Sequence, residues 1–219
     1  MILSRTKIRE RLDLPATDAR SLVVTPLPPS DEFDADSLDL RLGSYFLLPS
    51  AWNVAIASPY VSEDGPGRGA RVRVHVPIGE YLVIPSHQTV LGATLEFIKL
   101  PYDLSGEVLT KSSVARTFVV VETAPWVHPN YRGCLTLEIA NVSNSPALLY
   151  PGVPMCQLVL STIEAPEPPP ERLGGRYLGP IVPEEPIMPP LERQLGAIGA
   201  EYVRIIGSPE SRPIRKPPA

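Results

Sequence analysis

Apolar and polar residues alternate along much of this chain with the two-residue period of β-strands. The alternating or β-rich runs occupy residues 37–48, 71–76, 81–84, 94–100, 117–121, 134–140 and 155–161. Most are bounded by proline, glycine or asparagine, which commonly separate strands. Many short strands with no helices between them predict an all-β protein, an antiparallel sandwich or a distorted barrel of the jelly-roll type.

The beginning of the chain has the spacing of a short helix instead. Ser4 can cap a helix that continues to about Leu12 and turns Ile8 and Leu12 inward. Residues 117–121 and 155–160 differ from the other strands because they are nearly continuous apolar runs. We therefore expect these two strands to be buried on both faces, either in a tightly packed jelly roll or at a subunit interface.

The distribution of the 28 prolines divides the chain into two parts, because they crowd together after residue 164. Proline lacks the amide donor that helices and inner strands need, so this region cannot sustain either over long stretches. We predict a compact domain at residues 1–164 and a proline-rich extension, or lid, at residues 165–219. Within the extension, only residues 191–206 have apolar spacing compatible with a helix.

Composition and charge narrow the class of protein. Hydrophobic residues make up 43% of the chain and charged residues 20%, which is typical of soluble globular proteins. The formal net charge of −4 disfavours nucleic-acid binding, and no apolar run approaches the roughly 20 residues of a membrane span. Cys134 and Cys156 lie in apolar segments without metal-ligand spacing, so we expect core residues. A cytoplasmic enzyme or binding protein, with neither nucleic-acid nor membrane partners, fits best.

Candidate chemistry concentrates between residues 111 and 141. Two cations and two hydroxyls, a donor set suited to polyphosphate oxygens, occur within six residues: Lys111, Ser112, Ser113 and Arg116. Glu138 follows between two aliphatic neighbours, and partial burial favours the protonated form of a carboxyl group. The pairing suggests chemistry on a nucleotide. Taken singly, the cationic cluster also fits a solvated turn, and Glu138 also fits an exposed strand position.

Six blocks of the sequence occur in an order that resembles one family: MILSRTKI, SLDLRLGSYF, TLEFIKLPYDLSGEV, KSSVAR, the pair Thr123 and Ala124, and YRGCLTLEIAN. Together they resemble the dCTP deaminases of the dUTPase-like superfamily over about residues 1–164. KSSVAR matches the family's phosphate-loop pattern at all six positions. The resemblance implies a homotrimer of distorted β-barrels with sites at subunit boundaries. It also implies hydrolysis of dCTP to dUTP and ammonia, with Mg²⁺ bound through the substrate triphosphate.

The resemblance further implies roles for single residues. Glu138 would be the general base and acid that activates water for attack on C4 of cytosine. No zinc is expected, because the chain lacks the C-x-x-C signature of zinc-dependent nucleobase deaminases. The phosphate loop would hold the triphosphate. Residues near the base and sugar would be Ala124, His128, Thr136, Leu137 and Gln157, and the lid would contribute Arg176 and Tyr177. Ala124 also fits a core position, and Gln157 a paired buried amide.

Two positions depart from the family pattern. Val127-His128-Pro129 stands where the family usually has I-D-P or I-D-A, with an aspartate near the sugar 3′-hydroxyl. His128 could donate to that hydroxyl, but it cannot copy a carboxylate acceptor. The same aspartate positions the hydrolytic water in dUTPases, so its absence disfavours a diphosphatase. Pro180 stands where the lid pattern has a glutamine that contacts the phosphates.

Three interpretations stay open. The chain could deaminate dCTP, act as a dUTP diphosphatase alone or coupled to deamination, or be a catalytically impaired relative that binds nucleotides. The altered His128 and Pro180 positions motivate the third.

Overall fold

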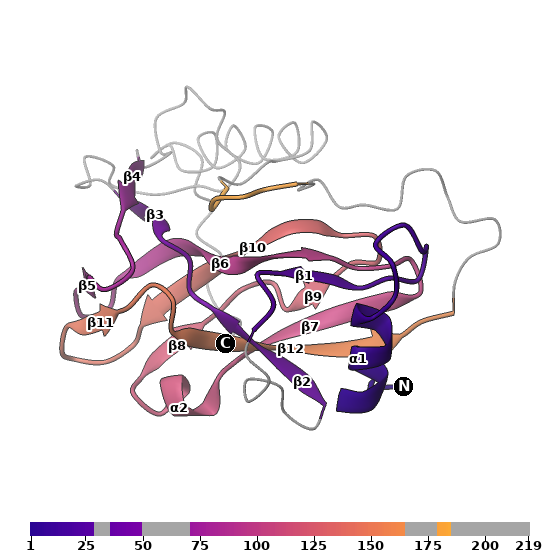
Figure 1. Cartoon of the computed structure of the whole chain (residues 1–219). Helices are drawn as coiled ribbons and strands as arrows, with labels where there is room; N and C mark the ends of the chain where they lie inside the picture. Colours follow the sequence, from indigo (N-terminus) through magenta and orange to yellow (C-terminus); the bar gives the residue numbers. More distant parts are fainter. Residues whose placement is uncertain (29–35, 50–70, 165–178, 185–219) are drawn as a thin grey trace, which may run out of the picture. The chain divides into compact units, whose positions relative to one another are not determined.

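The computed structural model describes residues 1–28, 36–49, 71–164 and 179–184, and within these ranges the chain folds mainly into antiparallel strands (Figure 1). The prediction of an all-β fold with a short N-terminal helix is confirmed. None of the helices in these ranges is long and apolar enough to cross a membrane.

Two sheets carry most of the described strands. The larger has the path β4-β3-β6-β10-β8, with β1 also paired to β6. Its strands are β1 (Val23–Thr25), β3 (Tyr45–Pro49), β4 (Arg71–His75), β6 (Thr89–Lys99), β8 (Val119–Val121) and β10 (Arg132–Asn141). The smaller has the order β2-β12-β7-β9. Its strands are β2 (Ser37–Arg41), β7 (Leu104–Thr110), β9 (Trp126–Val127) and β12 (Pro154–Thr162). The strands β5 (Leu82–Ile84) and β11 (Ala147–Leu149) pair separately.

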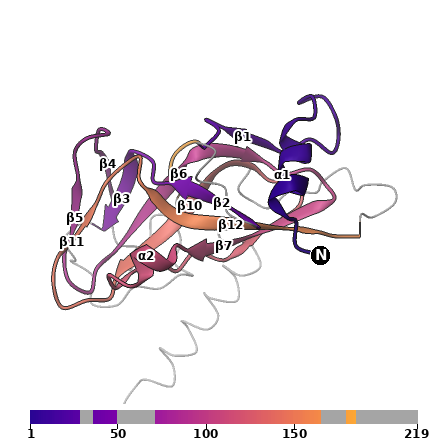
Figure 2. The same cartoon turned by 60° about the horizontal axis from the view of Figure 1, so that its bottom comes forward.

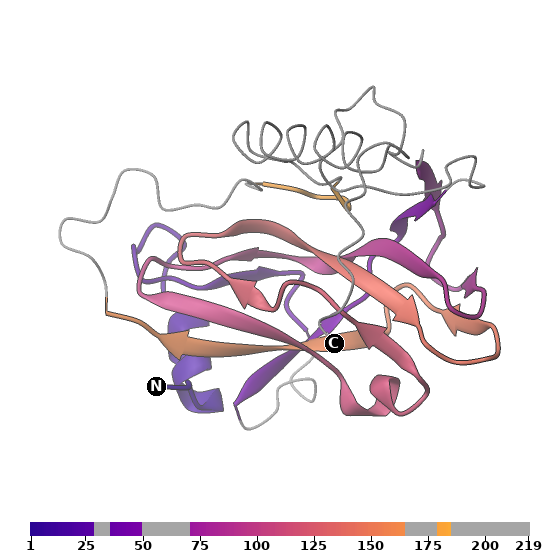
Figure 3. The ribbon, with the colours of Figure 1, turned by 180° about the vertical axis from the view of Figure 1, so that it is seen from behind.

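The hydrophobic core lies between the inner faces of the two large sheets. Figure 3 shows β10 crossing one layer, with β7 and β12 crossing the other. Fully buried side chains come from both layers, among them Phe46, Leu38, Ile98, Leu137 and Leu158. This shared core fixes the inward face of each strand, and the alternation of side chains then fixes the outward face.

The predicted N-terminal helix is α1 (Arg5–Leu12), which packs at one end of the sheets (Figure 2). Ile8 is fully buried and Leu12 packs against the core, as expected. Ser4 is the N-cap residue, but its side chain makes no capping hydrogen bond, so that detail of the prediction is wrong. Arg11 instead anchors the helix through an ion pair with Asp103, at 2.5 Å.

The expectation that two apolar runs are buried on both faces by the packing of a single chain is wrong, and burial at a subunit interface stays a prediction. In β8 only Val119 is buried, and its two successors are half-buried. In β12, buried Leu158 and Leu160 alternate with half-buried Gln157 and Val159. Valine-rich runs suit a strand on either face, so an unbroken apolar run does not by itself indicate burial on both sides.

A buried ion pair ties the smaller sheet to the larger one. Glu96 of β6 is fully buried and accepts hydrogen bonds from Arg41 of β2, through its backbone nitrogen at 2.9 Å and its Nε at 2.6 Å. Burial raises the pKa of the Glu96 carboxyl, and the hydrogen bonds from Arg41 oppose that shift. Removing Arg41 would leave the buried charge of Glu96 uncompensated, so the pair favours one arrangement of the two sheets.

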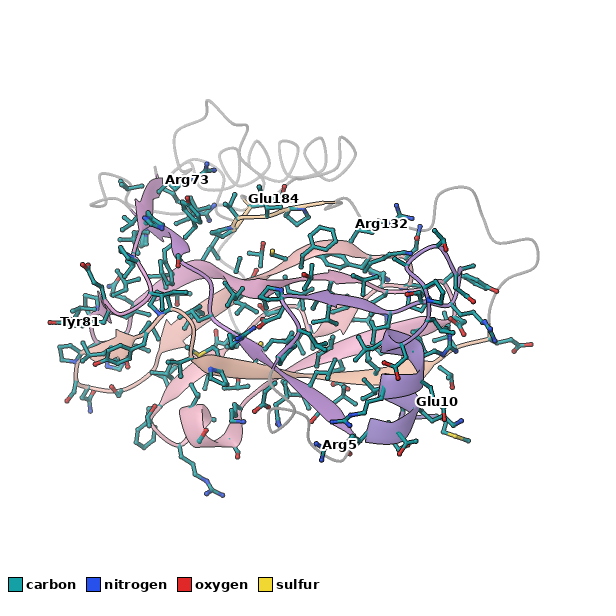
Figure 4. The ribbon with its side chains drawn as sticks, in the orientation of Figure 1. Arg5, Glu10, Arg73, Tyr81, Arg132 and Glu184 are labelled. Carbon is teal, nitrogen blue, oxygen red and sulfur yellow. The ribbon has the colours of Figure 1, made fainter. Side chains whose placement is uncertain are left out.

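Residues 179–184, part of the predicted extension, lie along β10. Gly179 N donates to Arg132 O at 2.6 Å, and Cys134 N donates to Pro180 O at 2.6 Å. Figure 4 shows Arg132 and Glu184 on the same side of this strand. The segment covers the β10 edge at residues 132–134, which β8 leaves open because it pairs only with residues 139–141. The boundary at residue 164 stays a prediction, and the expected helix at 191–206 lies outside the described residues.

Candidate active site

Glu138 projects from the outward face of β10. Its neighbours Leu137 and Ile139 are fully buried in the core, so the alternation of the strand turns the Glu138 side chain the other way. Pairing with β6 sets Leu137 opposite Gly92 and Glu138 opposite Leu91. A slip of one residue would bury the carboxylate and expose both aliphatic side chains, so the core holds Glu138 in place.

The Glu138 carboxylate is half-buried and is held on one side by Thr123. Thr123 Oγ1 lies 2.6 Å from Glu138 Oε2 and also 3.1 Å from the backbone oxygen of Thr136. The same hydroxyl accepts a hydrogen bond from Glu138 N at 3.0 Å. No other hydrogen bond reaches this carboxylate from the part of the chain that the structure describes, so Oε1 is available to a ligand.

Thr123 occupies this position because β8 ends there. The ladder between β8 and β10 continues one residue past β8, where Glu122 N donates to Glu138 O at 2.8 Å. The chain then turns away toward β9, and the next backbone acceptor for β10 is lost. The Thr123 hydroxyl replaces it, which satisfies a strand amide that would otherwise lack a partner.

The predicted phosphate loop forms the turn after β7. Lys111 is the N-cap residue of the short helix α2 (Ser112–Ala115), and Ser112, Ser113 and Arg116 are exposed. The loop is fixed at its base, because Thr110 Oγ1 accepts from Val121 N at 2.8 Å. Three of the four predicted phosphate ligands therefore present their side chains to solvent on a held turn.

Lys111, the fourth, is already paired. Its Nζ contacts Oδ2 of Asp39 in β2, while Gln157 Nε2 donates to Oδ1 of the same carboxylate at 3.1 Å. Asp39 is buried although it lies on the outward face of its sheet. Sequence reasoning missed Asp39, but the alternation in SLDLRLG carried the signal, since it places a carboxylate opposite the inward Leu38 and Leu40. Gln157 is a half-buried, paired amide in this arrangement.

The other predicted residues have separate environments. Ala124 is exposed two residues before β9, and His128 is exposed directly after it. Thr136 is half-buried, and its Oγ1 accepts from Glu184 N at 3.3 Å. The Leu137 side chain belongs to the core, so only its backbone could meet a ligand.

Pro180, which stands where the lid pattern has a glutamine, packs against β10. Gly133 has a φ of 144°, and a Cβ at this position would lie 2.3 Å from Pro180 Cδ. Only glycine permits that approach. Arg176 and Tyr177 lie outside the described residues.

Two separate groups of side chains therefore result. Glu138 is joined to Thr123, and Lys111 is joined to Gln157 through Asp39. Among the described residues, no hydrogen bond or ion pair connects Glu138 to the phosphate loop. Across the same ranges, no three His, Cys, Asp or Glu side chains cluster as metal ligands, and the zinc-free mechanism stays a prediction.

Comparison with known proteins identifies the family. The family model described as "dCTP deaminase-like" matches residues 2–163. The chain belongs to this family. The dCTP deaminase-like chain is 33% identical over 180 residues to a "dCTP deaminase, dUMP-forming" of Persephonella marina, covering 82% of this chain and 92% of that protein. It is 34% identical over 168 residues to a "dCTP deaminase" of Halorubrum lacusprofundi, covering 76% of this chain and 79% of that protein.

A solved structure supports the fold. The chain resembles the 2′-deoxycytidine 5′-triphosphate deaminase of Agrobacterium tumefaciens with a TM-score of 0.55 and 23% identity. The match covers 74% of the dCTP deaminase-like chain and 48% of the solved chain.

Replacing Asp39 with asparagine tests whether the Lys111 pair stabilises the fold. Asp39→Asn keeps an oxygen for Gln157 but removes the charge that holds Lys111. We expect the free energy of unfolding to fall by about 1 to 3 kcal/mol in urea denaturation. Glu10→Gln is the matched control, because its pair with Lys7 is exposed on α1 and should change stability by roughly 0.5 kcal/mol at most. Equal effects of the two substitutions would contradict a structural role for Asp39.

Proposed function

We propose that this chain catalyses the hydrolytic deamination of dCTP. The observation that carries the proposal is Glu138, which β10 turns outward with one oxygen held by Thr123 and the other available to water. Membership of the dCTP deaminase-like family and the names of the relatives support it.

The proposed reaction needs one proton carrier. Glu138 takes a proton from water and passes it to N3 while the hydroxide bonds to C4 of cytosine. Glu138 then takes the second proton from the hydroxyl on C4 and gives it to the amino group, the bond between C4 and nitrogen breaks, and ammonia leaves. One carboxylate that accepts and then donates serves each transfer, so the products are a uracil nucleotide and ammonia without redox change.

The triphosphate is proposed to bind the loop around α2. Ser112, Ser113 and Arg116 offer exposed hydroxyls and a guanidinium, which suit phosphate oxygens. Lys111 contributes positive charge that Asp39 partly offsets. Mg²⁺ is proposed to arrive with the nucleotide, coordinated by its phosphate oxygens.

A second activity, hydrolysis of dUTP to dUMP, is suggested by the relatives named "dUMP-forming". His128 counts against it, because the resembling family places an aspartate there and histidine offers no carboxylate to orient a phosphate-directed water. We therefore propose dUTP as the main product, with dUMP as the alternative.

The active site is proposed to form between copies in a homotrimer. Glu138 faces outward from the larger sheet and Lys111 is held on the outward face of the smaller one. Large apolar side chains are exposed near the phosphate loop and in β9. They include Leu109 before the loop, Phe118 after it and Trp126 in β9. Association would cover these side chains and could bring the phosphate loop of one copy to the Glu138 of another.

Incubation with dCTP and Mg²⁺ tests the activity directly. We expect ammonia to be released in step with the formation of a uracil nucleotide. Chromatography should show dUTP as the main product. Appearance of dUMP and pyrophosphate would replace this product assignment with the coupled activity. No turnover, with dCTP binding retained, would contradict the proposed enzyme and favour a binding protein.

Mixed trimers test whether the site is shared. Glu138→Gln should lack turnover, and Arg116→Ala should bind the triphosphate weakly because a charge-assisted contact is lost. Suppose that each site takes Glu138 from one copy and Arg116 from its neighbour. When the two variants are co-expressed in equal amounts, both residues should then be present at roughly a quarter of the subunit boundaries. We expect a corresponding recovery of activity.

The control for this experiment mixes the two variants after separate purification, without subunit exchange. Co-expressed variants that show no recovery above this control would contradict a shared site.

A further inference from the structure

The Thr123 hydroxyl has one proton and three hydrogen-bond neighbours. Glu138 N donates to it at 3.0 Å, which occupies one lone pair of Oγ1. Its proton can then point to Glu138 Oε2 at 2.6 Å or to the Thr136 backbone oxygen at 3.1 Å. The shorter contact and the negative charge favour the carboxylate as acceptor when Glu138 is ionised.

This geometry makes the two oxygens of Glu138 unequal. Oε2 is occupied by Thr123, whereas Oε1 receives no hydrogen bond from the described residues. A carboxylate free to rotate would offer either oxygen to water. One that is held at Oε2 offers Oε1 in a fixed direction, so less conformational freedom is lost when water and substrate bind.

We propose that Thr123 is a positioning residue for the deamination proposed above: its hydroxyl holds Glu138 Oε2, and proton transfer then takes place through Oε1. The role rests on the proposed function of Glu138. Water gives its first proton to Oε1, which passes it to N3 as the hydroxide bonds to C4, and Oε1 then carries the second proton from the C4 hydroxyl to the departing amine. Thr123 gains and loses no proton in this sequence.

The Thr136 backbone oxygen gives the hydroxyl a second orientation. When Glu138 is neutral, Oε2 becomes a weaker acceptor, and rotation about the Cβ–Oγ1 bond can redirect the Thr123 proton to Thr136 O. The donor therefore has a partner in both charge states of Glu138. This lowers the cost of moving between the two charge states, because the Thr123 proton has an acceptor in each of them.

A purely structural role for Thr123 makes a different prediction. If the hydroxyl only completed the strand ladder by accepting from Glu138 N, its loss would reduce stability and leave turnover per folded molecule unchanged. A positioning role requires that kcat falls while dCTP binding persists, since the phosphate loop is intact.

Substitution of Thr123 separates the two roles. Thr123→Val keeps the shape but removes the hydroxyl, and we expect kcat for dCTP to fall by about 10- to 100-fold with KM changed less than about threefold. Thr123→Ser restores the hydroxyl and should recover kcat to within about threefold of wild type. Thr162→Val is the matched control, because among the described residues the Thr162 hydroxyl bonds only the Met1 backbone oxygen, at the end of β12, and the substitution should have no effect.

Thr123→Ala gives a second measurement if the valine variant does not fold, with the same expected loss in kcat. Full kcat in the valine or alanine variant, an equal loss in the serine variant, or a loss confined to KM would overturn the role of Thr123. In each of these cases turnover by the wild-type chain leaves the proposed function standing. Absence of wild-type turnover would overturn both.

Discussion

The register of β10 is the constraint on which the rest of the site depends. Leu137 and Ile139 are fully buried, so the core fixes which face of the strand is inward and leaves Glu138 on the other. The same strand pairs with β6 along most of its length and with β8 at its end, and the end of β8 brings Thr123 to the carboxylate. Hydrophobic packing therefore fixes the direction of the Glu138 side chain, without a large set of polar contacts. A half-buried carboxylate with one oxygen held is suited to passing protons between water and a bound base.

A second carboxylate organises the opposite sheet in a comparable way. Asp39 projects outward from β2 and gathers Lys111 and Gln157 around one buried charge. Its charge offsets that of Lys111, which leaves Arg116 as the exposed cation of the loop. Pro180 packs on Gly133 and so places a further segment beside β10. The same segment contacts β10 again at Thr136, whose Oγ1 accepts a hydrogen bond from Glu184 N. Each of these contacts uses a position that strand alternation turned away from the core.

Much of the fold could be predicted from the sequence, because alternation and proline punctuation are local signals. The strands around residues 37–48, 94–100 and 134–140 and the helix that buries Ile8 followed from them. The burial of residues 117–121 could not, since β-branched residues fit either face of a strand. The position of Glu138 was predictable from its two aliphatic neighbours. The partners of Lys111 and Glu138 were not, because Asp39 and Thr123 reach them through strand pairings between distant parts of the chain. Family resemblance named the residues that we propose for the chemistry, while the contacts that hold them required the structure.

The most direct test of the account is the rate of ammonia release from dCTP by Glu138→Gln, measured together with dCTP affinity. Glutamine keeps the shape of the side chain but cannot accept the proton of water. The account predicts that deamination falls by at least about 100-fold while dCTP still binds with near wild-type affinity. Glu122→Gln, which changes an exposed carboxylate one residue before Thr123, should leave the rate unchanged. Substantial deamination by Glu138→Gln would contradict the assignment of Glu138 as the proton carrier.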